Sequence, residues 1–329
     1  MDVQFADATP EWAFPPEPLA AISRSNSLEF KQSLAILYGD RRNRSLIEIF
    51  STFVLLAAFI YILVRYPGPW TYVGAFLGIG LMQYRMMIAC HEAVHKTLLF
   101  PFWLNELCGL LHCALVGINF TRYRRQHVYH HRSHDVSQDP DAYIYAPILR
   151  VRPGFRRVIV WIFGTAAEVV EKFRQKGPTG TGNFDFTGKA KRDSIVIIAV
   201  QVALVSASAF LLNWWTYFAF WTLPLLTVAV FMNRTRVMVE HGYAYVAGMG
   251  SQQDCSSASV QTVDVASNPL ERFFLAPYLF NYHFAHHSVP SVPHYNNPAL
   301  ARLLAKRENI NQLRVSGSYI RAIVRVLAG

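Results

Sequence analysis

Residues 194–233 read SIVIIAVQVALVSASAFLLNWWTYFAFWTLPLLTVAVFMN and contain no charged side chain. A membrane-spanning helix needs about 20 predominantly apolar residues, so this stretch is too long for one crossing and has the length of two. The polar Asn213, followed by Trp214 and Trp215, indicates a turn at a membrane interface, where aromatic residues concentrate. We therefore expect two spans, over about 194–212 and 214–233.

Two further apolar runs lie nearer the N-terminus, over about 46–64 and 70–90. Arg85 interrupts the second run and is expected to snorkel or to point into the cytosolic part of the protein. Of all residues 52% are hydrophobic and 16% are charged, whereas soluble domains have roughly 25% charged residues. The sequence thus predicts an all-α integral membrane protein with four transmembrane helices in two hairpins and a cytosolic helical cap.

Basic residues orient these spans. They are Arg41, Arg42 and Arg44 before the first span, Lys189, Lys191 and Arg192 before the third, and Arg234 and Arg236 after the fourth. Positively charged loops remain in the cytoplasm, so we expect a multi-pass protein of a bacterial inner membrane with both termini cytosolic. The same loops account for the net charge of +10, and no recognition motif suggests a nucleic-acid partner.

These boundaries divide the chain into three parts. We expect a cytosolic N-terminal segment over 1–44, a membrane domain over 45–304, and a cytosolic C-terminal tail over 305–329. The N-terminal residues are acidic and rich in proline, so they are not expected to form a cleavable signal peptide.

Two apolar segments do not fit the four spans. If 98–120 crossed the membrane, the histidines on either side of it would lie on opposite faces, so we expect it to dip in and return or to lie along the interface. We expect 158–170 to form a helix at the interface.

Eight of the twelve histidines form three tight clusters beside the apolar runs. The first cluster is HEAVH, the second HVYHH, and the third HFAHH. Imidazole is the commonest side-chain metal ligand, and eight imidazoles exceed the needs of one tetrahedral zinc. Within HxxHH we expect the first two histidines to share a helix face, with the third beside them. The predicted topology brings all three clusters to one side, so we expect a two-metal site with nine ligands: His91, His95, His127, His130, His131, His241, His283, His286 and His287.

Other polar residues near the clusters are expected to orient these ligands, because a ligating histidine usually donates its second N–H to a carboxylate or carbonyl. The candidates for this second shell are Glu92, His134, Asp135, Asp139, Asp141, Glu240 and His294. We expect no catalytic side chain separate from the metal ligands. Imidazole suits zinc, copper, iron and nickel, so ligand type alone does not choose the metal.

The order and spacing of HEAVH, HVYHH and NYHFAHH, with paired spans between the second and third, resemble the membrane fatty-acid desaturase and hydroxylase superfamily. The sequences HHRSHDVSQDPD and HHSVPSVPHYNNPAL after the second and third clusters are also similar to that family, and the resemblance covers about 76–304. It implies a non-haem di-iron centre, held by the nine histidines on the cytosolic face, that uses dioxygen as co-substrate.

The resemblance implies oxidation of an unactivated C–H bond in a lipid-like substrate, above all desaturation of an acyl chain. Hydroxylation or ketone formation on an acyl, alkane, carotenoid or small-molecule substrate remains the alternative within the superfamily. No haem or iron–sulfur motif is evident, so we expect a separate electron donor of the ferredoxin, rubredoxin or cytochrome type. A basic face for that donor is expected from Arg122, Arg124, Arg125, Arg150, Arg152, Arg156 and Arg157.

Two alternatives lie outside the superfamily. HEAVH also fits the HExxH pattern of zinc proteases, with Glu92 as the base, but that interpretation leaves at least six clustered histidines unused. A metal carrier places polar ligands inside its spans, whereas here the clusters lie at the ends of the spans.

Overall fold

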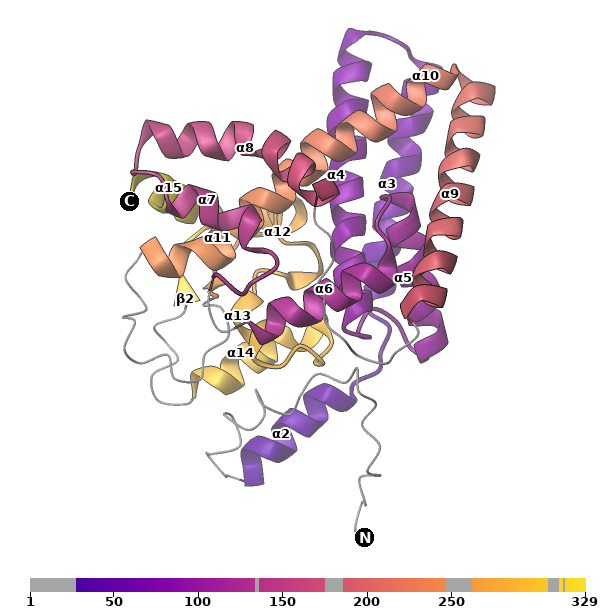
Figure 1. Cartoon of the computed structure of the whole chain (residues 1–329). Coiled ribbons are helices and arrows are strands. Elements are labelled where there is room, and N and C mark those ends of the chain that lie inside the picture. The colour runs from indigo at the N-terminus through magenta and orange to yellow at the C-terminus, as the bar shows by residue number, and fades with distance from the viewer. Residues whose placement is uncertain (1–27, 134–135, 175–185, 247–261, 307–313, 316) are drawn as a thin grey trace.

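The four predicted spans are helices in a computed structural model that describes residues 28–133, 136–174, 186–246, 262–306, 314–315 and 317–329. They are α3 (Ser45–Arg65), α4 (Pro69–Val94), α9 (Phe186–Leu211) and a continuous helical run over Trp214–Val246. That run contains α10 (Trp214–Tyr217), two π-helical turns (Phe218–Thr222 and Leu225–Ala229) and α11 (Val230–Val246). All four are long and apolar enough to cross a membrane. Helices α3, α4 and α9 stand side by side, and the fourth run slants from the end of α9 down to α11 on the left of the view (Figure 1).

The environments of these helices differ. In α4, 78% of the most apolar window is buried inside the protein, whereas none of the corresponding window of α9 is buried. The outer surface of α9 exposes Ile195, Ile198 and Val202, as expected for side chains that face lipid. Arg85, on α4, is buried and pairs with Glu48 of α3, and its Nη1 donates to the Phe273 carbonyl over 3.1 Å. The charge is therefore compensated inside the protein rather than at a lipid surface.

The segment over 98–120 contains one helix, and a sharp bend in the chain follows it. Helix α5 (Phe102–Leu115) and helix α6 (Phe120–Arg132) meet at an angle of 101°. Gly117 takes a positive φ of 69° in the turn, a conformation that costs glycine little. Asn119 then caps α6 by accepting a 3.1 Å hydrogen bond from the Arg122 backbone. The turn thus redirects the chain, so that α6 passes beneath the ends of the long helices (Figure 1).

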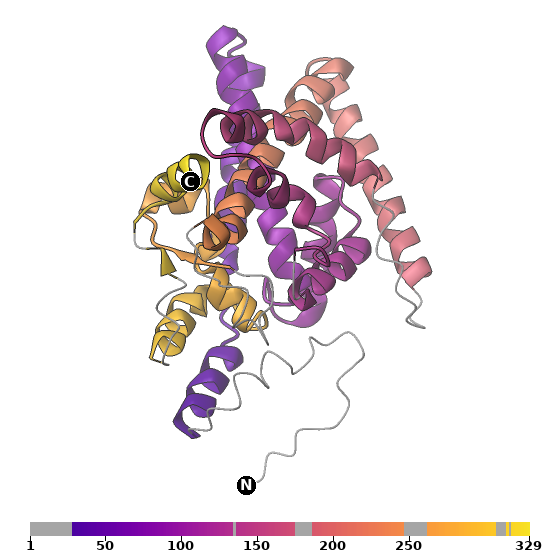
Figure 2. The same cartoon turned by 60° about the vertical axis from the view of Figure 1, so that its left-hand side comes forward.

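The remaining elements form a layer at one end of the long helices (Figures 1 and 2). It comprises α7 (Ala142–Leu149), α8 (Phe155–Arg174), α12 (Pro269–Phe274), α13 (His283–Ser288), α14 (Asn297–Ala305) and 3-10 turns over Pro277–Leu279 and His294–Asn296. The predicted helix over 158–170 is part of α8, which lies to the left of α3, α4 and α9 in Figure 1 and packs against the fourth helical run. It exposes Ile159, Ile162 and Phe163, the kind of apolar side that a helix at a membrane interface requires.

Both predicted terminal segments contain residues that pack on this layer. Helix α2 (Leu28–Gly39) contacts α14 through Phe30, Leu300 and Leu304. The segment over 305–329, expected as a tail, contains strand β2 (Arg314–Val315), which pairs in parallel with β1 (Asp264–Val265). It ends in α15 (Tyr319–Ala328), whose Tyr319, Ala322 and Val326 are buried. This last segment is therefore part of the folded protein, because its apolar side chains belong to the main core.

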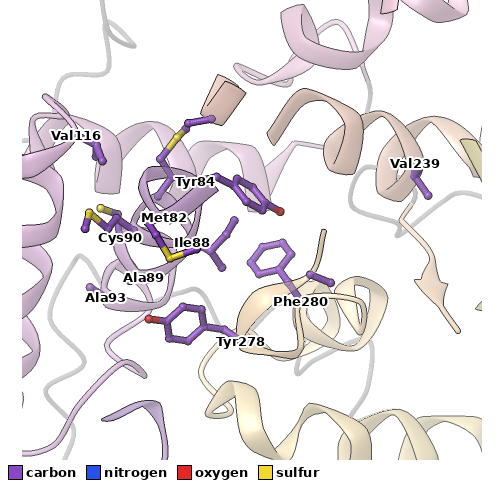
Figure 3. Close-up of a cluster of buried hydrophobic side chains, with 14 of the residues drawn as sticks. Met82, Tyr84, Ile88, Ala89, Cys90, Ala93, Val116, Val239, Tyr278 and Phe280 are labelled. Carbon is purple, nitrogen blue, oxygen red and sulfur yellow. The ribbon is translucent and has the colours of Figure 1, made fainter. Parts of the chain in front are cut away.

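The main core lies where α4 enters the layer. Figure 3 shows Met82, Tyr84 and Ile88 of α4 close to Tyr278 and Phe280, which precede α13. The Tyr84 hydroxyl donates a hydrogen bond to the Leu275 carbonyl. Buried side chains of this kind fix α4 relative to α13, and both of these helices carry clustered histidines.

Candidate metal centre

Four helices bring the nine predicted histidines together, and all nine are buried. Helix α4 carries His91 and ends at His95, its C-cap residue. The second cluster lies on α6, His241 lies on α11, and the third cluster lies on α13. Two of the long helices extend past the predicted apolar spans: α4 continues to Val94 and the fourth helical run to Val246. His91 and His241 therefore lie on the long helices themselves.

The nine histidines form two groups, within each of which the candidate ligand nitrogens lie within 4.8 Å of one another. The first group is His91, His95, His127, His131 and His286; the second is His130, His241, His283 and His287. The groups adjoin, since the His131 and His287 rings stack with centroids 4.1 Å apart. Two clusters of imidazoles in contact are the arrangement expected for a pair of metal ions.

Each HxxHH cluster is divided between the two groups. His127 shares a group with His131, not with His130, and His283 shares a group with His287, not with His286. The reason is helix geometry: with 3.6 residues per turn, residues four apart differ by about 40° around the axis and residues three apart by about 60°. Each HxxHH cluster therefore contributes two ligands to one group and one to the other.

The ring nitrogens fit metal coordination better than hydrogen bonding. His127 Nε2 lies 2.9 Å from His95 Nε2, and His283 Nε2 lies 2.9 Å from His241 Nε2. Burial and the neighbouring imidazoles hold the pKa of His95, His283 and His287 well below the usual value. These rings are therefore neutral at pH 7, the form that binds a metal. Neither ring nitrogen of His287 has a hydrogen-bond partner in the part of the chain that the structure describes.

Asp139 is the predicted second-shell residue with the closest contact to a clustered histidine. Its Oδ1 lies 2.7 Å from His130 Nδ1, and its Oδ2 accepts a 2.6 Å hydrogen bond from the Tyr145 hydroxyl. Burial alone would lower the pKa of His130, but the Asp139 carboxylate outweighs it and raises that pKa. Tyr145 also stacks on His241, with ring centroids 5.1 Å apart. Asp139 and Tyr145 thus fix two members of the four-histidine group.

Glu240 lies on the other side of that group. Its Oε2 lies 3.5 Å from His283 Nδ1 and pairs with Arg236, while its Oε1 accepts a 2.7 Å hydrogen bond from the Tyr319 hydroxyl. Tyr319 begins α15, so the C-terminal helix contacts a neighbour of the four-histidine group. In the five-histidine group, Glu92 Oε1 lies 3.2 Å from His91 Nδ1, and its Oε2 accepts from Thr97 over 3.0 Å.

The other second-shell candidates lie further away or outside the described residues. Asp141 accepts a 2.7 Å hydrogen bond from Gln126, and its Oδ2 is 3.9 Å from His130 Nδ1. His294 Nε2 lies 2.8 Å from Ser45 Oγ, and its ring packs against Tyr278. His134 and Asp135 fall outside the described residues. His112, which the sequence did not assign to the centre, contacts the Cys108 carbonyl through Nδ1 at 2.8 Å.

Sequence reasoning missed Tyr145, Tyr319, Thr97 and Arg236 as neighbours of the centre. Tyr145 follows Asp139 by six residues, so its position near the second cluster was the one available signal. Tyr319 lies far from every cluster along the chain, and only the packing of α15 on α11 brings it to Glu240.

A cavity of about 870 Å³ reaches both histidine groups. Its lining includes His91 and His127 from the first group, and His130, His241 and His283 from the second. It therefore provides space for a substrate beside both candidate metal positions.

Comparison with known proteins gives one family and one relative. A family model described as fatty acid desaturase matches residues 67–314. A protein from Bradyrhizobium elkanii named dihydrorhizobitoxine desaturase is 27% identical over 243 residues, which cover 68% of this chain and 65% of the relative. The match thus spans a little less than two thirds of the relative's length. All nine clustered histidines lie within the residues that the family model matches.

Proposed function

Because the chain belongs to the fatty acid desaturase family, and is therefore an oxidoreductase, we propose that it uses two histidine-bound irons and dioxygen to oxidise an unactivated C–H bond. The observation that supports this best is the pair of adjoining groups of five and four buried histidines. Imidazole binds iron well, and imidazole rings that lie beside one another suit a metal pair. A single zinc, as in a protease, would use four ligands at most in its usual geometry.

Iron supplies the activation of dioxygen and the oxidation itself. The residues of this chain hold the two ions, orient the rings and exclude water. Asp139, Glu92 and Glu240 contact one nitrogen each of His130, His91 and His283, which leaves the other nitrogen to face the metal. The cavity holds the substrate carbon next to the centre, and positioning decides which hydrogen is removed.

Desaturation is the reaction we favour, since both the family description and the relative's name refer to it. The balanced reaction takes one saturated C–C unit, dioxygen, two electrons and two protons to one alkene and two waters. Hydroxylation takes the same reactants to one alcohol and one water. The electrons come from a separate donor protein, for which we propose a ferredoxin, rubredoxin or cytochrome.

The expected docking face for this donor is smaller than the sequence suggested. Arg157 is buried and donates to the Val326 carbonyl, and Arg124 pairs with Glu106. Arg122 and Arg125 line the cavity. The exposed residues Arg150, Arg152 and Arg156 remain for contact with an acidic donor.

Metal analysis of the purified protein tests the centre. We expect about two irons per chain, in keeping with a two-metal site. Replacing one histidine of each group, as in His131→Ala with His287→Ala, should remove both ions, whereas His112→Ala should retain them. One zinc per chain instead of iron would contradict the proposal and favour the protease alternative.

Product analysis tests the reaction. The chain is expressed with a matched electron donor, and extracts are compared by mass spectrometry with those of the His131→Ala, His287→Ala variant. Loss of two hydrogens from a compound supports desaturation, and gain of one oxygen supports hydroxylation. Dioxygen uptake by the iron-loaded protein, supplied with a reducing donor and cell extract, is compared with uptake by the variant. If the protein consumed dioxygen no faster than the variant, the proposal would be wrong.

A further inference from the structure

The C-terminal helix α15 exposes a strip of apolar side chains beside a strip of arginines. Ile320 and Val324 are 62% and 58% exposed, and because they lie four residues apart they share one side of the helix. Arg321 and Arg325 are exposed as well. Successive residues differ by about 100° around the axis, so the two arginines form a separate strip next to the apolar one. A third side of the helix, which includes Tyr319, is buried.

We propose that this surface of α15 lies in the cytosolic leaflet of the membrane, where its arginines bind anionic phospholipid headgroups. This contact goes beyond the proposed oxidation, because it requires neither a metal ion nor a substrate. A helix with an apolar side and basic residues next to it lies in the plane of the interface, with the apolar side about 5–10 Å deep. Lipid then removes the two aliphatic side chains of α15 from water, which is favourable.

Helix α8, which packs against α15, exposes apolar side chains on a larger scale. Phe155, Ile159 and Phe163 are exposed, and their spacing of four residues places them along one side of the helix. Two charged residues of α8, Arg157 and Glu168, are buried instead. A helix whose outer side faces water typically shows the opposite arrangement. Lipid is the surrounding of a membrane protein that suits such an outer side.

The two helices adjoin because the end of α15 abuts the start of α8. The backbone N–H of Gly154 donates to the Leu327 carbonyl over 2.7 Å, and Arg157 Nη1 donates to the Val326 carbonyl over 2.6 Å. These bonds satisfy carbonyl groups in the last turn of α15, where a helix leaves them without partners of its own. Helix α15 is thus held beside α8, so a leaflet that receives α8 lies next to α15 as well.

The position of α15 in the fold agrees with a place at the lipid surface. Both α8 and α15 pack on α11 of the fourth helical run, and they lie on the side of α13 and α14 toward which the long helices extend (Figures 1 and 2). Helix α2 lies at the opposite end of the molecule (Figure 1). It also exposes apolar side chains, Leu28 at 70% and Ile36 at 73%. Exposure alone therefore does not distinguish α15 from α2, whereas their positions relative to the spans do.

The charge of this surface favours an anionic phospholipid as the partner. Neither 142–167 nor 314–329 contains an aspartate or a glutamate, so both segments are purely basic. Basic residues near a bilayer attract anionic headgroups, and arginine binds phosphate through two parallel hydrogen bonds. A single phospholipid offers a phosphate to the arginine strip and an acyl chain to the apolar strip. A soluble acidic protein, such as an electron donor, matches the arginine strip alone.

Photo-crosslinking to lipids tests this contact on the unchanged full-length protein. The protein is reconstituted in nanodiscs of phosphatidylcholine and phosphatidylglycerol, in which a trace of one of the two lipids carries a photoreactive diazirine near the glycerol end of an acyl chain. After illumination and digestion, mass spectrometry quantifies the lipid adducts on each helix. We expect adducts on α15, on α8 and on the span α9, with only background on α2. The phosphatidylglycerol probe should label α15 more strongly than the phosphatidylcholine probe, by about fivefold for each arginine that binds a headgroup.

A double variant separates the headgroup contact from the apolar contact. Arg321→Gln with Arg325→Gln should lower the labelling of α15 by the phosphatidylglycerol probe to the level of the phosphatidylcholine probe. Both side chains are exposed, so the core does not depend on them. Arg302→Gln is the matched control, because it changes an exposed arginine of α14, and it should leave the preference for phosphatidylglycerol unchanged.

Adducts on α9 without adducts on α15 would overturn the proposed contact, because the bilayer would then reach the spans alone. Equal labelling of α2 and α15 would overturn it as well, since the adducts would not report a lipid surface. Equal labelling of α15 by the two probes, or a preference that survives the double variant, would rule out the anionic headgroup. If α15 gave no lipid adducts but crosslinked to an acidic electron carrier, the surface would be a protein docking site instead. None of these results depends on bound iron, so they leave the proposed oxidation to its own tests.

Discussion

Asp139 and His130 form a close contact between a carboxylate and a clustered histidine, with Oδ1 and Nδ1 2.7 Å apart. The Tyr145 hydroxyl holds the second carboxylate oxygen at 2.6 Å. Asp139 is therefore fixed from both sides and in turn fixes the ring of His130. A ligand ring held in this way keeps its other nitrogen aimed at the metal without loss of conformational freedom on binding.

Replacing Asp139 with asparagine should weaken the metal held by the four-histidine group. Loss of a partner of this kind typically reduces metal affinity by about 10- to 100-fold. We expect Asp139→Asn to retain the iron of the five-histidine group and to lose much of the other, as measured by iron content after dialysis against a chelator. Asp141→Asn is the matched control, because its Oδ2 is 3.9 Å from the same nitrogen. Equal iron loss in both variants would argue against the role of Asp139.

Removing the Tyr319 hydroxyl should affect both stability and the centre. That hydroxyl donates to Glu240 over 2.7 Å, and its loss leaves a buried carboxylate oxygen without this partner, at a cost of about 1–3 kcal/mol in the free energy of unfolding. We expect Tyr319→Phe to lower the thermal midpoint and the iron content. Tyr295→Phe removes a 3.1 Å bond to the Asp40 carbonyl and should leave the iron content unchanged. A Tyr319→Phe protein with full iron content would show that the contact is only structural.

The sequence was informative about the spans because lipid imposes a simple constraint on them. A charge-free run of 194–233 has few alternatives to two membrane helices. The ends of these helices were not predictable in the same way. The apolar run of the second span ends near Cys90, yet α4 continues to Val94, because its last turn is covered by the core around Tyr278 and Phe280 instead of by water.

The site was predictable where one helix turn determines it, and not where distant segments meet. The clustering of histidines indicated the candidate ligands directly from their spacing. The division into groups of five and four depends on how α6 and α13 are rotated against α4 and α11. Contacts such as Tyr319 with Glu240, separated by 79 residues, follow only from tertiary packing. No local pattern in the sequence encodes that packing.

Buried His294 should make the protein less stable in mild acid. Burial lowers its pKa from 6.5 to about 3, so between these values the unfolded chain binds a proton that the folded protein does not. The free energy of unfolding therefore falls as the pH is lowered below 6.5, by about 2 kcal/mol at pH 5. We expect His294→Gln to remove this contribution while its amide retains a contact with Ser45.

The prediction is checked by measuring the thermal midpoints of the wild-type protein and of His294→Gln between pH 7.5 and 5. Protonation of the clustered histidines lowers the midpoint of both proteins equally, so the difference between the curves isolates the proton of His294. The curves should converge as the pH falls, because the wild-type protein loses the additional stability. Curves that stay parallel over this range would contradict the assignment of His294 as a neutral buried group.

Labelling of single cysteines should place α6 and α12 on the same side of the membrane. Tyr129 lies on α6 between His127 and His130, and Leu270 lies on α12, shortly before α13; both are exposed. Their neighbouring histidines belong to common groups, so the two sites cannot be separated by the bilayer. Trp70 is 87% exposed at the start of α4. It lies about 30 Å along the helix axis from His91, which is about the thickness of the hydrocarbon core.

The variants Tyr129→Cys, Leu270→Cys and Trp70→Cys are made with the four native cysteines replaced by alanine. A membrane-impermeant maleimide applied to intact cells should label Trp70→Cys alone, because the histidine groups are expected on the cytosolic side. Permeabilised cells should show labelling at all three positions. Labelling of Tyr129→Cys and Leu270→Cys in intact cells, with Trp70→Cys protected, would show that the protein has the opposite orientation in the membrane. The two histidine groups would still lie on one side, so a shared metal centre would remain in agreement with the result. Labelling of Tyr129→Cys and Leu270→Cys from opposite sides would rule out a shared centre, because imidazoles on two membrane faces cannot bind the same metal.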